Sequence, residues 1–276
     1  MKFTPLTNYI GSEVEGVDLA NTSDSERQKI KHALLDRGVL FFRKQSLDAQ
    51  DQSNFVSAFA NSTSHQSWMR SAGPNVYKVE GKPSESYNYS SGFVHWHQDS
   101  TFFTHYPHGS LLSAQHLPEI GGDTLWSSTC AAFEAFPEPV KQMLLSLEAL
   151  HDMTASKIYR LNPFMNTTED NIESNTKAVF KHLPVTHPVV LKHPCTSKPC
   201  LFVNRVWTSK IIGIDLDLSE SILKLCYDWI AKPRFQVRWK WHLGDVALYD
   251  NISTAHIAVH DYRDSRLLHR SDFRYN

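Results

Sequence analysis

The sequence has little of what marks several common classes of protein. Its 276 residues include only four cysteines, and no two of them form a Cys-x-x-Cys pair. A disulfide-rich scaffold or a zinc ribbon is therefore not indicated. Lys and Arg (28) nearly balance Asp and Glu (29), which leaves a formal net charge of -1. A chain without an excess of either charge gives no reason to expect nucleic acid or an acidic membrane as a partner.

Long hydrophobic runs are also missing. The first residues, Met1-Lys2-Phe3-Thr4-Pro5, lack the apolar run of a signal peptide, and no stretch approaches the roughly 18 apolar residues of a membrane span. We therefore expect a cytoplasmic protein with no membrane partner. In a reducing cytosol, Cys130, Cys195, Cys200 and Cys226 are expected to remain free thiols.

What the sequence does contain is material for one large, mainly β domain over residues 1–276. Hydrophobic residues make up 41% of the chain and aromatic residues 12%, enough for an extensive core. Between residues 235 and 243 every second residue is apolar, which predicts a strand with one buried face. Many predicted strands and no alternating βαβ units favour a double-stranded β-helix (a cupin-like jelly roll) with flanking helices over a Rossmann sheet.

A few helices and two irregular stretches complete the expected organisation. Ser23 and Asp48 suit the N-cap position of helices, and the segment 137–151 has the apolar spacing of an amphipathic helix. Residues 61–92 and 156–177 are polar and irregular. Loops of this length in a compact domain often serve as lids or binding loops, and we expect the same here.

The segment Val94-His95-Trp96-His97-Gln98-Asp99 carries the first sign of chemistry. Side chains alternate along a strand, so His97 and Asp99 would point to the same side. A distant histidine would complete the two-His-one-carboxylate triad that holds non-haem Fe(II) and leaves positions open. His256 is a candidate, although a single histidine among fifteen is more often structural, and the same donors can bind zinc. We interpret His95 as a buried neighbour.

Two arginines near the C-terminus add independent evidence. Arg266 and Arg270 are four residues apart, so in a strand they would project from one face. Two buried guanidinium groups are costly unless anions meet them. A solvated basic rim is one interpretation, whereas a cavity that binds a dicarboxylate cosubstrate and an acidic substrate would need such a pair.

These residues belong to a longer series of motifs, through which the sequence resembles the taurine dioxygenase family of Fe(II)- and 2-oxoglutarate-dependent oxygenases over nearly its full length. The motifs are Thr4-Pro5-Leu6, Tyr9-Ile10-Gly11, Trp96-His97-Gln98-Asp99, Gly121-Gly122-Asp123-Thr124-Leu125-Trp126, Phe202-Val203-Asn204, Lys232-Pro233, Phe235-Gln236-Val237-Arg238-Trp239, Asp250-Asn251 before His256, and Arg266-Leu267-Leu268-His269-Arg270. Several ordered motifs are far more specific than a His-x-Asp pair alone.

The resemblance implies a set of iron and cosubstrate ligands. His97, Asp99 and His256 would bind Fe(II), and Thr124 with Arg266 would bind the distal carboxylate of 2-oxoglutarate. Dioxygen would be the second cosubstrate.

The resemblance also implies a substrate site for a small anionic organic molecule. His65 and Arg270 would bind a sulfonate with help from the backbone amide of Ser100, while Trp68 and Trp207 would form the walls. The two tryptophans depart from the family's taurine enzymes, which have a smaller ring at each place. The pocket is therefore compatible with a sulfonate other than taurine.

The implied reaction is hydroxylation of taurine or a similar sulfonate at the carbon beside sulfur, which releases sulfite and an aldehyde together with succinate and CO2. The same chemistry on an alkyl sulfate or an aryloxy carboxylate is the main alternative. A jelly-roll zinc hydrolase or a non-catalytic metal-binding protein is a further alternative, although His193, Cys195 and Cys200 are too incomplete a set for structural zinc. A homo-oligomer is compatible with the sequence.

Overall fold

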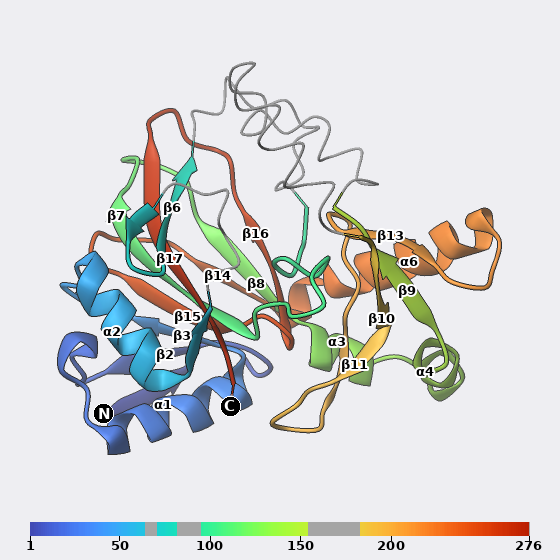
Figure 1. Cartoon of the computed structure of the whole chain (residues 1–276), viewed down its shortest axis with the longest axis horizontal. Coiled ribbons are helices and arrows are strands. Elements are labelled where there is room, and N and C mark those ends of the chain that lie inside the picture. Colours follow the sequence, from blue (N-terminus) through green and yellow to red (C-terminus); the bar gives the residue numbers. More distant parts are fainter. Residues whose placement is uncertain (64–70, 82–94, 154–182, 276) are drawn as a thin grey trace.

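A computed structural model describes residues 1–63, 71–81, 95–153 and 183–275 of the protein (Figure 1). In these ranges the chain is mainly β, with helices outside the sheets, as expected for a jelly roll. The larger sheet runs in the order β1-β2-β3-β15-β7-β17-β6-β5, and β4 also pairs with β17. Its strands are β1 (Lys2–Pro5), β2 (Ser12–Glu15), β3 (Val39–Phe42), β4 (Asn61–Thr63), β5 (Ser71–Gly73), β6 (Val76–Gly81), β7 (Gly109–His116), β15 (Val246–Asp250) and β17 (Arg266–Arg274).

A smaller antiparallel sheet packs against the larger one. It consists of β14 (Gln236–Trp239), β8 (Thr124–Ser128) and β16 (Thr254–Ala258), with β8 in the middle. The core between the sheets is aromatic: Phe41 of β3 stacks on Trp239 of β14 with ring centroids 4.1 Å apart. Val237 and Trp239 of β14 face this core, so the alternation predicted for residues 235–243 is confirmed within this strand. The strand is shorter than predicted, because it ends at Trp239, and Leu243 is exposed.

Two helices cover the larger sheet near the N-terminus, α1 (Asp24–Arg37) and α2 (Ala49–Phe59). The predicted caps are confirmed: the side chains of Ser23 and Asp48 each accept a hydrogen bond from the third residue of their helix. Gly38 ends α1 with φ of 72°, a conformation that favours glycine. No helix in the described ranges is long and apolar enough to cross a membrane.

A second group of elements lies on the opposite side of the smaller sheet from α1 and α2 (Figure 1). It has its own apolar core, which joins helices to short strands. Its members are α3 (Thr129–Glu134), α4 (Glu138–Leu145), β9 (Glu148–His151), β10 (Val185–Pro188), β11 (Val190–Lys192), β12 (Pro199–Leu201), β13 (Thr208–Ile211) and α6 (Leu216–Ile230). Two 3-10 turns, η1 (Leu19–Asn21) and η5 (Pro233–Phe235), complete the elements.

The structure corrects two predicted segments. The helix expected over residues 137–151 ends at Leu145, because the following residues form β9, which pairs with both β10 and β13. The stretch 61–92, predicted to be irregular, contains three strands: β4 and β6 each pair with β17, and β5 pairs with β6. Residues 64–70 and 82–92 of the first expected loop, and all of the second, 156–177, lie outside the described residues.

The cysteine prediction is also corrected. Cys130 of α3 and Cys200 of β12 form a disulfide across 70 residues of sequence. The pairing follows from the packing of α3 on β12, a tertiary contact that composition does not reveal. Cys195 and Cys226 are free thiols, as expected.

The C-terminal end of the chain packs on a buried histidine. The backbone amide of Tyr275 donates a hydrogen bond to Nδ1 of His108 (3.1 Å), so this nitrogen carries no proton. Burial, with Arg274 nearby, lowers the pKa of His108 to about 4. His108 is therefore neutral at physiological pH.

Candidate metal centre

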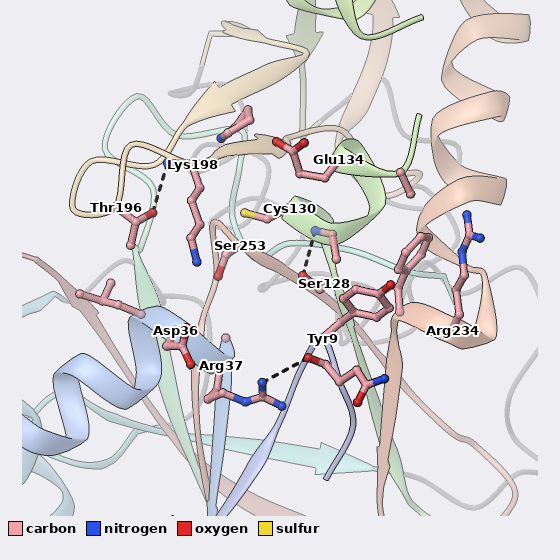
Figure 2. A pocket seen from close by; sticks show the side chains of 17 residues that line it. Tyr9, Asp36, Arg37, Ser128, Cys130, Glu134, Thr196, Lys198, Arg234 and Ser253 are labelled. Atoms are coloured by element: carbon pink, nitrogen blue, oxygen red, sulfur yellow. Dashed lines mark hydrogen bonds between the residues drawn. The ribbon is translucent and has the colours of Figure 1, made fainter. Parts of the chain in front are cut away.

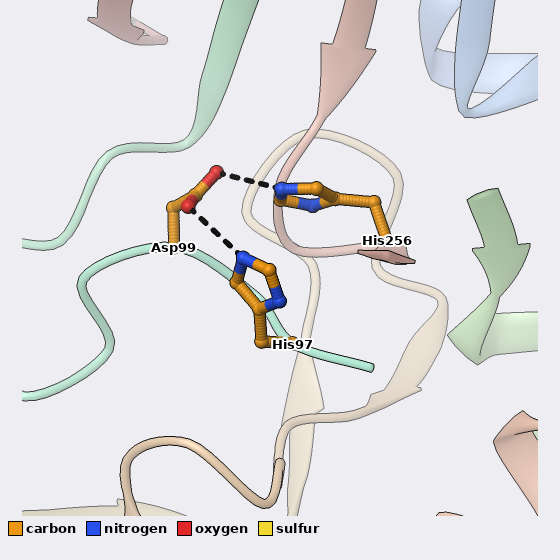
Figure 3. Close-up of side chains that lie close together, drawn as sticks. All are labelled: His97, Asp99 and His256. Carbon is orange, nitrogen blue, oxygen red and sulfur yellow. Dashed lines mark ion pairs between the residues drawn. The ribbon is translucent and has the colours of Figure 1, made fainter. Parts of the chain in front are cut away.

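Three predicted residues, two of them close in the sequence and the third more than 150 residues away, meet in a buried cluster: His97, Asp99 and His256 (Figure 3). His97 forms a two-way backbone bridge with His256, with N–O distances of 3.0 and 2.8 Å. Asp99 presents one oxygen 3.7 Å from Nε2 of His97 and the other 3.4 Å from Nε2 of His256. All three ligand atoms lie within 4.8 Å of one another. The structure thus brings together the two imidazoles and the carboxylate that the sequence analysis grouped.

The local backbone differs from the strand expected around residues 94–99. His97 makes only an isolated bridge, and Asp99 begins a turn in which Ser100 has φ of 55°. The turn is held by Asn251, whose side-chain oxygen accepts from the amide of Asp99 (2.7 Å). The Asn251 amide group donates to the carbonyls of Asp99 (3.0 Å) and Pro107 (2.9 Å). This clamp, and not a strand, points Asp99 toward the histidines.

The two imidazoles present the same nitrogen to the cluster. Nδ1 of His97 donates to the backbone carbonyl of His95 (2.8 Å). Nε2 is then the unprotonated nitrogen, whose lone pair can bind a metal. His95 thus contacts the cluster through its backbone carbonyl. Its side chain is only half-buried, so the interpretation of His95 as a buried neighbour is corrected. The ring of His256 packs beside the rings of Trp126 and Tyr249, with centroid distances of 6.4 and 5.0 Å.

The charge states suit a metal site. Burial lowers the pKa of His97, and it lowers the pKa of His256 to about 3, so both rings are neutral at pH 7. Burial also acts to raise the pKa of the Asp99 carboxyl. The charge of Arg270 and a 2.8 Å hydrogen bond from Tyr249 act in the opposite direction, and the pKa of Asp99 lies well below its ordinary value.

A second predicted pair lies beside the cluster. Nη2 of Arg266 donates to Oγ1 of Thr124 (3.0 Å), and its Nε donates to the carbonyl of Gly122 (3.0 Å). The indole N–H of Trp241 also donates to Thr124 (3.0 Å). Thr124 lies two residues from Trp126 on β8, which pairs with His256 on β16. Arg266 is only 5% exposed, so the solvated-rim interpretation of this arginine is wrong.

Arg270 is buried and contacts the cluster directly. Its Nη1 lies 2.9 Å from Oδ1 of Asp99. On the other side, Nε donates to Oδ1 of Asp272 (2.7 Å) and Nη2 to the hydroxyl of Ser110 (3.3 Å). Arg266, Leu268 and Arg270 share the buried face of β17, as their spacing predicted.

The remaining residues predicted to bind the substrate divide into two groups. Ser100 is buried next to Asp99, and Trp207 packs on Phe102 with ring centroids 4.6 Å apart. Phe102 follows the Asp99 turn directly, so Trp207 lies against the segment that carries this ligand. His65 and Trp68 lie outside the described residues.

A cavity of about 590 Å3 lies elsewhere (Figure 2). The N-terminal segment, the end of α1, α3 and the β11–β12 turn line it, with Tyr9, Arg37, Cys130, Lys198 and Arg234 among its residues. None of the predicted site residues lines this cavity.

Three residues that hydrogen-bond to Asp99 or Arg270 were not identified from the sequence as site residues: Tyr249, Asn251 and Asp272. Asn251 was noted only as part of a motif, and its position just before His256 in the chain was the available signal. Asp272 continues the alternation of Arg266 and Arg270 along one strand face, which could have singled it out. Nothing in the sequence pattern points to Tyr249.

The donor set fits Fe(II). Two neutral imidazoles and one carboxylate gathered on one side of an ion are the facial triad of non-haem iron oxygenases. The same cluster is the single group of three or more His, Cys, Asp or Glu found for a metal in the described ranges.

The sequence comparisons agree with this chemistry. Residues 2–271 match the model of the "Taurine catabolism dioxygenase TauD, TfdA family". The chain belongs to this family. It is 32% identical to an alkylsulfatase of Acinetobacter baylyi over 96% of this chain and 81% of that protein. It is 31% identical to an alpha-ketoglutarate-dependent sulfate ester dioxygenase of Pseudomonas putida over 94% of this chain and 84% of that one.

The structure is also similar to solved members of the family. The crystal structure of a taurine dioxygenase from Burkholderia xenovorans superposes with a TM-score of 0.82 and 29% identity, and it covers all of this chain and 89% of the other. The jelly-roll fold is thus confirmed, and the chain is a 2-oxoglutarate-dependent dioxygenase that uses Fe(II) and O2. The zinc-hydrolase and non-catalytic alternatives are set aside.

Proposed function

We propose that this dioxygenase hydroxylates a small organosulfur monoanion at the carbon next to its sulfur-containing head group. His97, Asp99 and His256 bind Fe(II), and Arg266 with Thr124 binds the distal carboxylate of 2-oxoglutarate. With both bound, the metal supplies dioxygen activation coupled to release of succinate and CO2. The observation that carries the proposal is Arg270, a buried guanidinium 2.9 Å from the Asp99 carboxylate, where an anionic substrate head would lie next to the oxidant.

The protein's own residues bind and orient in this proposal. Arg266 is fixed by two hydrogen bonds, so it can receive a carboxylate without losing much side-chain freedom. Burial of both arginines strengthens their charge-assisted hydrogen bonds, because water does not compete for them. Placing the reacting carbon close to the metal is then a matter of anchoring the substrate head on Arg270.

A sulfonate is our first candidate for the substrate. Hydroxylation beside the sulfonate gives an unstable hydroxysulfonate, which releases sulfite and leaves an aldehyde. Taurine is the simplest example, and the structural neighbour named above is a taurine dioxygenase.

An alkyl sulfate is the second candidate, and the apolar cluster around Trp207 favours it. Phe102, Met153, Val206 and Trp207 pack together, each less than 9% exposed, next to the Asp99 turn. Such a wall suits an alkyl chain better than the ammonium group of taurine. Hydroxylation at the carbon that bears the sulfate oxygen would release inorganic sulfate and an aldehyde.

A succinate-release screen tests both candidates. The enzyme is supplied with Fe(II), 2-oxoglutarate and O2, and with taurine, longer alkylsulfonates, alkyl sulfates or aryloxyacetates. We expect succinate above the substrate-free background with a sulfonate or an alkyl sulfate, together with an equal amount of sulfite or sulfate. Succinate coupled only to an aryloxyacetate, with neither sulfur product, would reject the proposal.

A further inference from the structure

The proposed function does not yet use Asp272, a buried carboxylate that contacts Arg270 on the side away from Asp99. Asp272 is fully buried, and its Oδ1 accepts hydrogen bonds from Nε of Arg270 (2.7 Å) and from Oγ of Ser110 (2.6 Å). Ser110 is also fully buried, and its hydroxyl is uncharged. Asp272 and Arg270 thus form an ion pair inside the protein, at the end of the substrate site.

The sheet itself builds this arrangement. Asp272 of β17 lies directly opposite Ser110 of β7, and Ser110 lies opposite Tyr249 of β15. Arg270 is two residues from Asp272, so its side chain emerges on the same face. Tyr249 donates to Oδ2 of Asp99 while Arg270 contacts Oδ1. Asp272, Ser110 and Tyr249 therefore form a row across three strands, while Arg270 contacts both Asp272 and the Asp99 carboxylate.

The pair changes the charge that the substrate meets. In the loaded enzyme the charges of Fe(II), Asp99, 2-oxoglutarate and Arg266 cancel, and Asp272 cancels that of Arg270. These groups, all within the described residues or the bound cosubstrate and metal, thus sum to no net positive charge where a substrate anion would enter. One negative charge can be held by the directed hydrogen bonds of Arg270, whereas a second charge would be repelled by Asp272 and Asp99, and none of the groups counted here would offset it.

We propose that Asp272 is a specificity-determining residue that restricts the Arg270 site to monoanions and excludes dianions. The inference rests on the proposed function, in which Arg270 receives the substrate head. Sulfonates and sulfate esters carry one charge near neutral pH, whereas inorganic sulfate carries two. The pair thus lets the enzyme accept organosulfur head groups while rejecting an inorganic anion of nearly the same size and shape.

Methanesulfonate and inorganic sulfate are a matched pair of probes. Their affinities are measured by calorimetry at neutral pH, with protein loaded with 2-oxoglutarate and Ni(II), which supports binding without turnover. We expect the native protein to bind methanesulfonate at least about tenfold more tightly than sulfate, a factor that corresponds to 1.4 kcal/mol. Equal or tighter binding of sulfate, or no binding of methanesulfonate, would overturn the proposal, and this comparison needs no variant.

Asp272→Asn keeps the shape and removes the charge, so the preference for methanesulfonate should shrink by about tenfold. Asp272→Glu keeps the charge and should retain the preference. Asp245→Asn is the matched control, because Asp245 is also buried, 1% exposed, and paired with an arginine, Arg43, at another place in the fold. An unchanged preference in Asp272→Asn contradicts the inference.

Different results would refute the proposed function and the role of Asp272. If the succinate screen finds no organosulfur substrate, the proposed function is wrong whatever the calorimetry gives. If the screen finds such a substrate but Asp272→Asn keeps the native preference, the proposed function stands and only the role of Asp272 is wrong.

Discussion

Replacement of Asn251 by alanine should separate metal binding from folding. Asn251 makes three side-chain hydrogen bonds with distances of 2.7, 3.0 and 2.9 Å, two of them to the backbone of Asp99. Asn251 itself contacts no metal-ligand side chain in these bonds. Its removal would therefore act on the metal only by releasing the turn that aims Asp99.

The size of the effect follows from those bonds. A net intramolecular hydrogen bond contributes about 1 kcal/mol, and a buried amide left without a partner costs about 1–3 kcal/mol. We expect Asn251→Ala to lower the free energy of unfolding by about 2–5 kcal/mol. Loss of a partner that orients a metal ligand commonly weakens metal binding by about 10- to 100-fold, and we expect a loss of Fe(II) affinity in that range.

The assay is an anaerobic Fe(II) titration in the presence of 2-oxoglutarate, with urea unfolding of the metal-free protein measured in parallel. Asn204→Ala is a suitable control. Asn204 is equally buried, and its side chain binds the amides of Val206 and Trp207 and the hydroxyl of Thr101, but not Asp99. It should lose comparable stability and keep native Fe(II) affinity. Equal Fe(II) affinities in Asn251→Ala and the native protein would refute the reasoning.

Three further predictions concern the arginines, the carboxylate ligand and a buried histidine. Arg266→Ala should raise the KM for 2-oxoglutarate about 10- to 100-fold, the equivalent of one charge-assisted hydrogen bond, whereas Arg270→Ala should raise the KM for the substrate; equal effects of both changes on both KM values would contradict the assignment. Asp99→Ala should abolish Fe(II)-dependent succinate formation, and retained turnover would show that the metal ligands are misassigned. His108 has a pKa of about 4 in the folded state, below the ordinary 6.5, so the unfolded state binds more protons as the pH falls through 6.5. The free energy of unfolding contributed by His108 is thus complete above about pH 6.5 and falls toward pH 4, by about 2 kcal/mol at pH 5. Between pH 7.5 and 5, urea unfolding should therefore show a smaller loss of stability for His108→Asn than for the native protein. An identical loss in both would refute this.

The arginine pair could be predicted from the sequence because Arg266 and Arg270 share one face of a strand, as their spacing indicates. His97 and Asp99 were also grouped correctly as candidate metal ligands, but a turn held by Asn251, and not the expected strand, brings them together. His256 could not be chosen by spacing alone among fifteen histidines, and it required the ordered motifs of the family. The helix caps at Ser23 and Asp48 were predictable because capping is a local interaction.

The parts that failed depend on contacts between distant segments. Leu147 and Leu150 fit the end of an amphipathic helix. Residues 148–151 nevertheless form β9, because they pair with the distant strands β10 and β13. Asn251 and Asp99 are separated by 152 residues, and no local pattern links them. The Cys130–Cys200 disulfide likewise depends on how α3 packs on β12.

The central claim is that His97, Asp99 and His256 hold Fe(II) next to a 2-oxoglutarate site formed by Arg266 and Thr124. The most direct test is the visible spectrum of the protein after anaerobic addition of Fe(II) and 2-oxoglutarate. We expect a metal-to-ligand charge-transfer band that requires both additions. The band should be lost in His256→Ala and should need more 2-oxoglutarate in Arg266→Ala. The absence of the band in the native protein, or its persistence unchanged in His256→Ala, would contradict the claim.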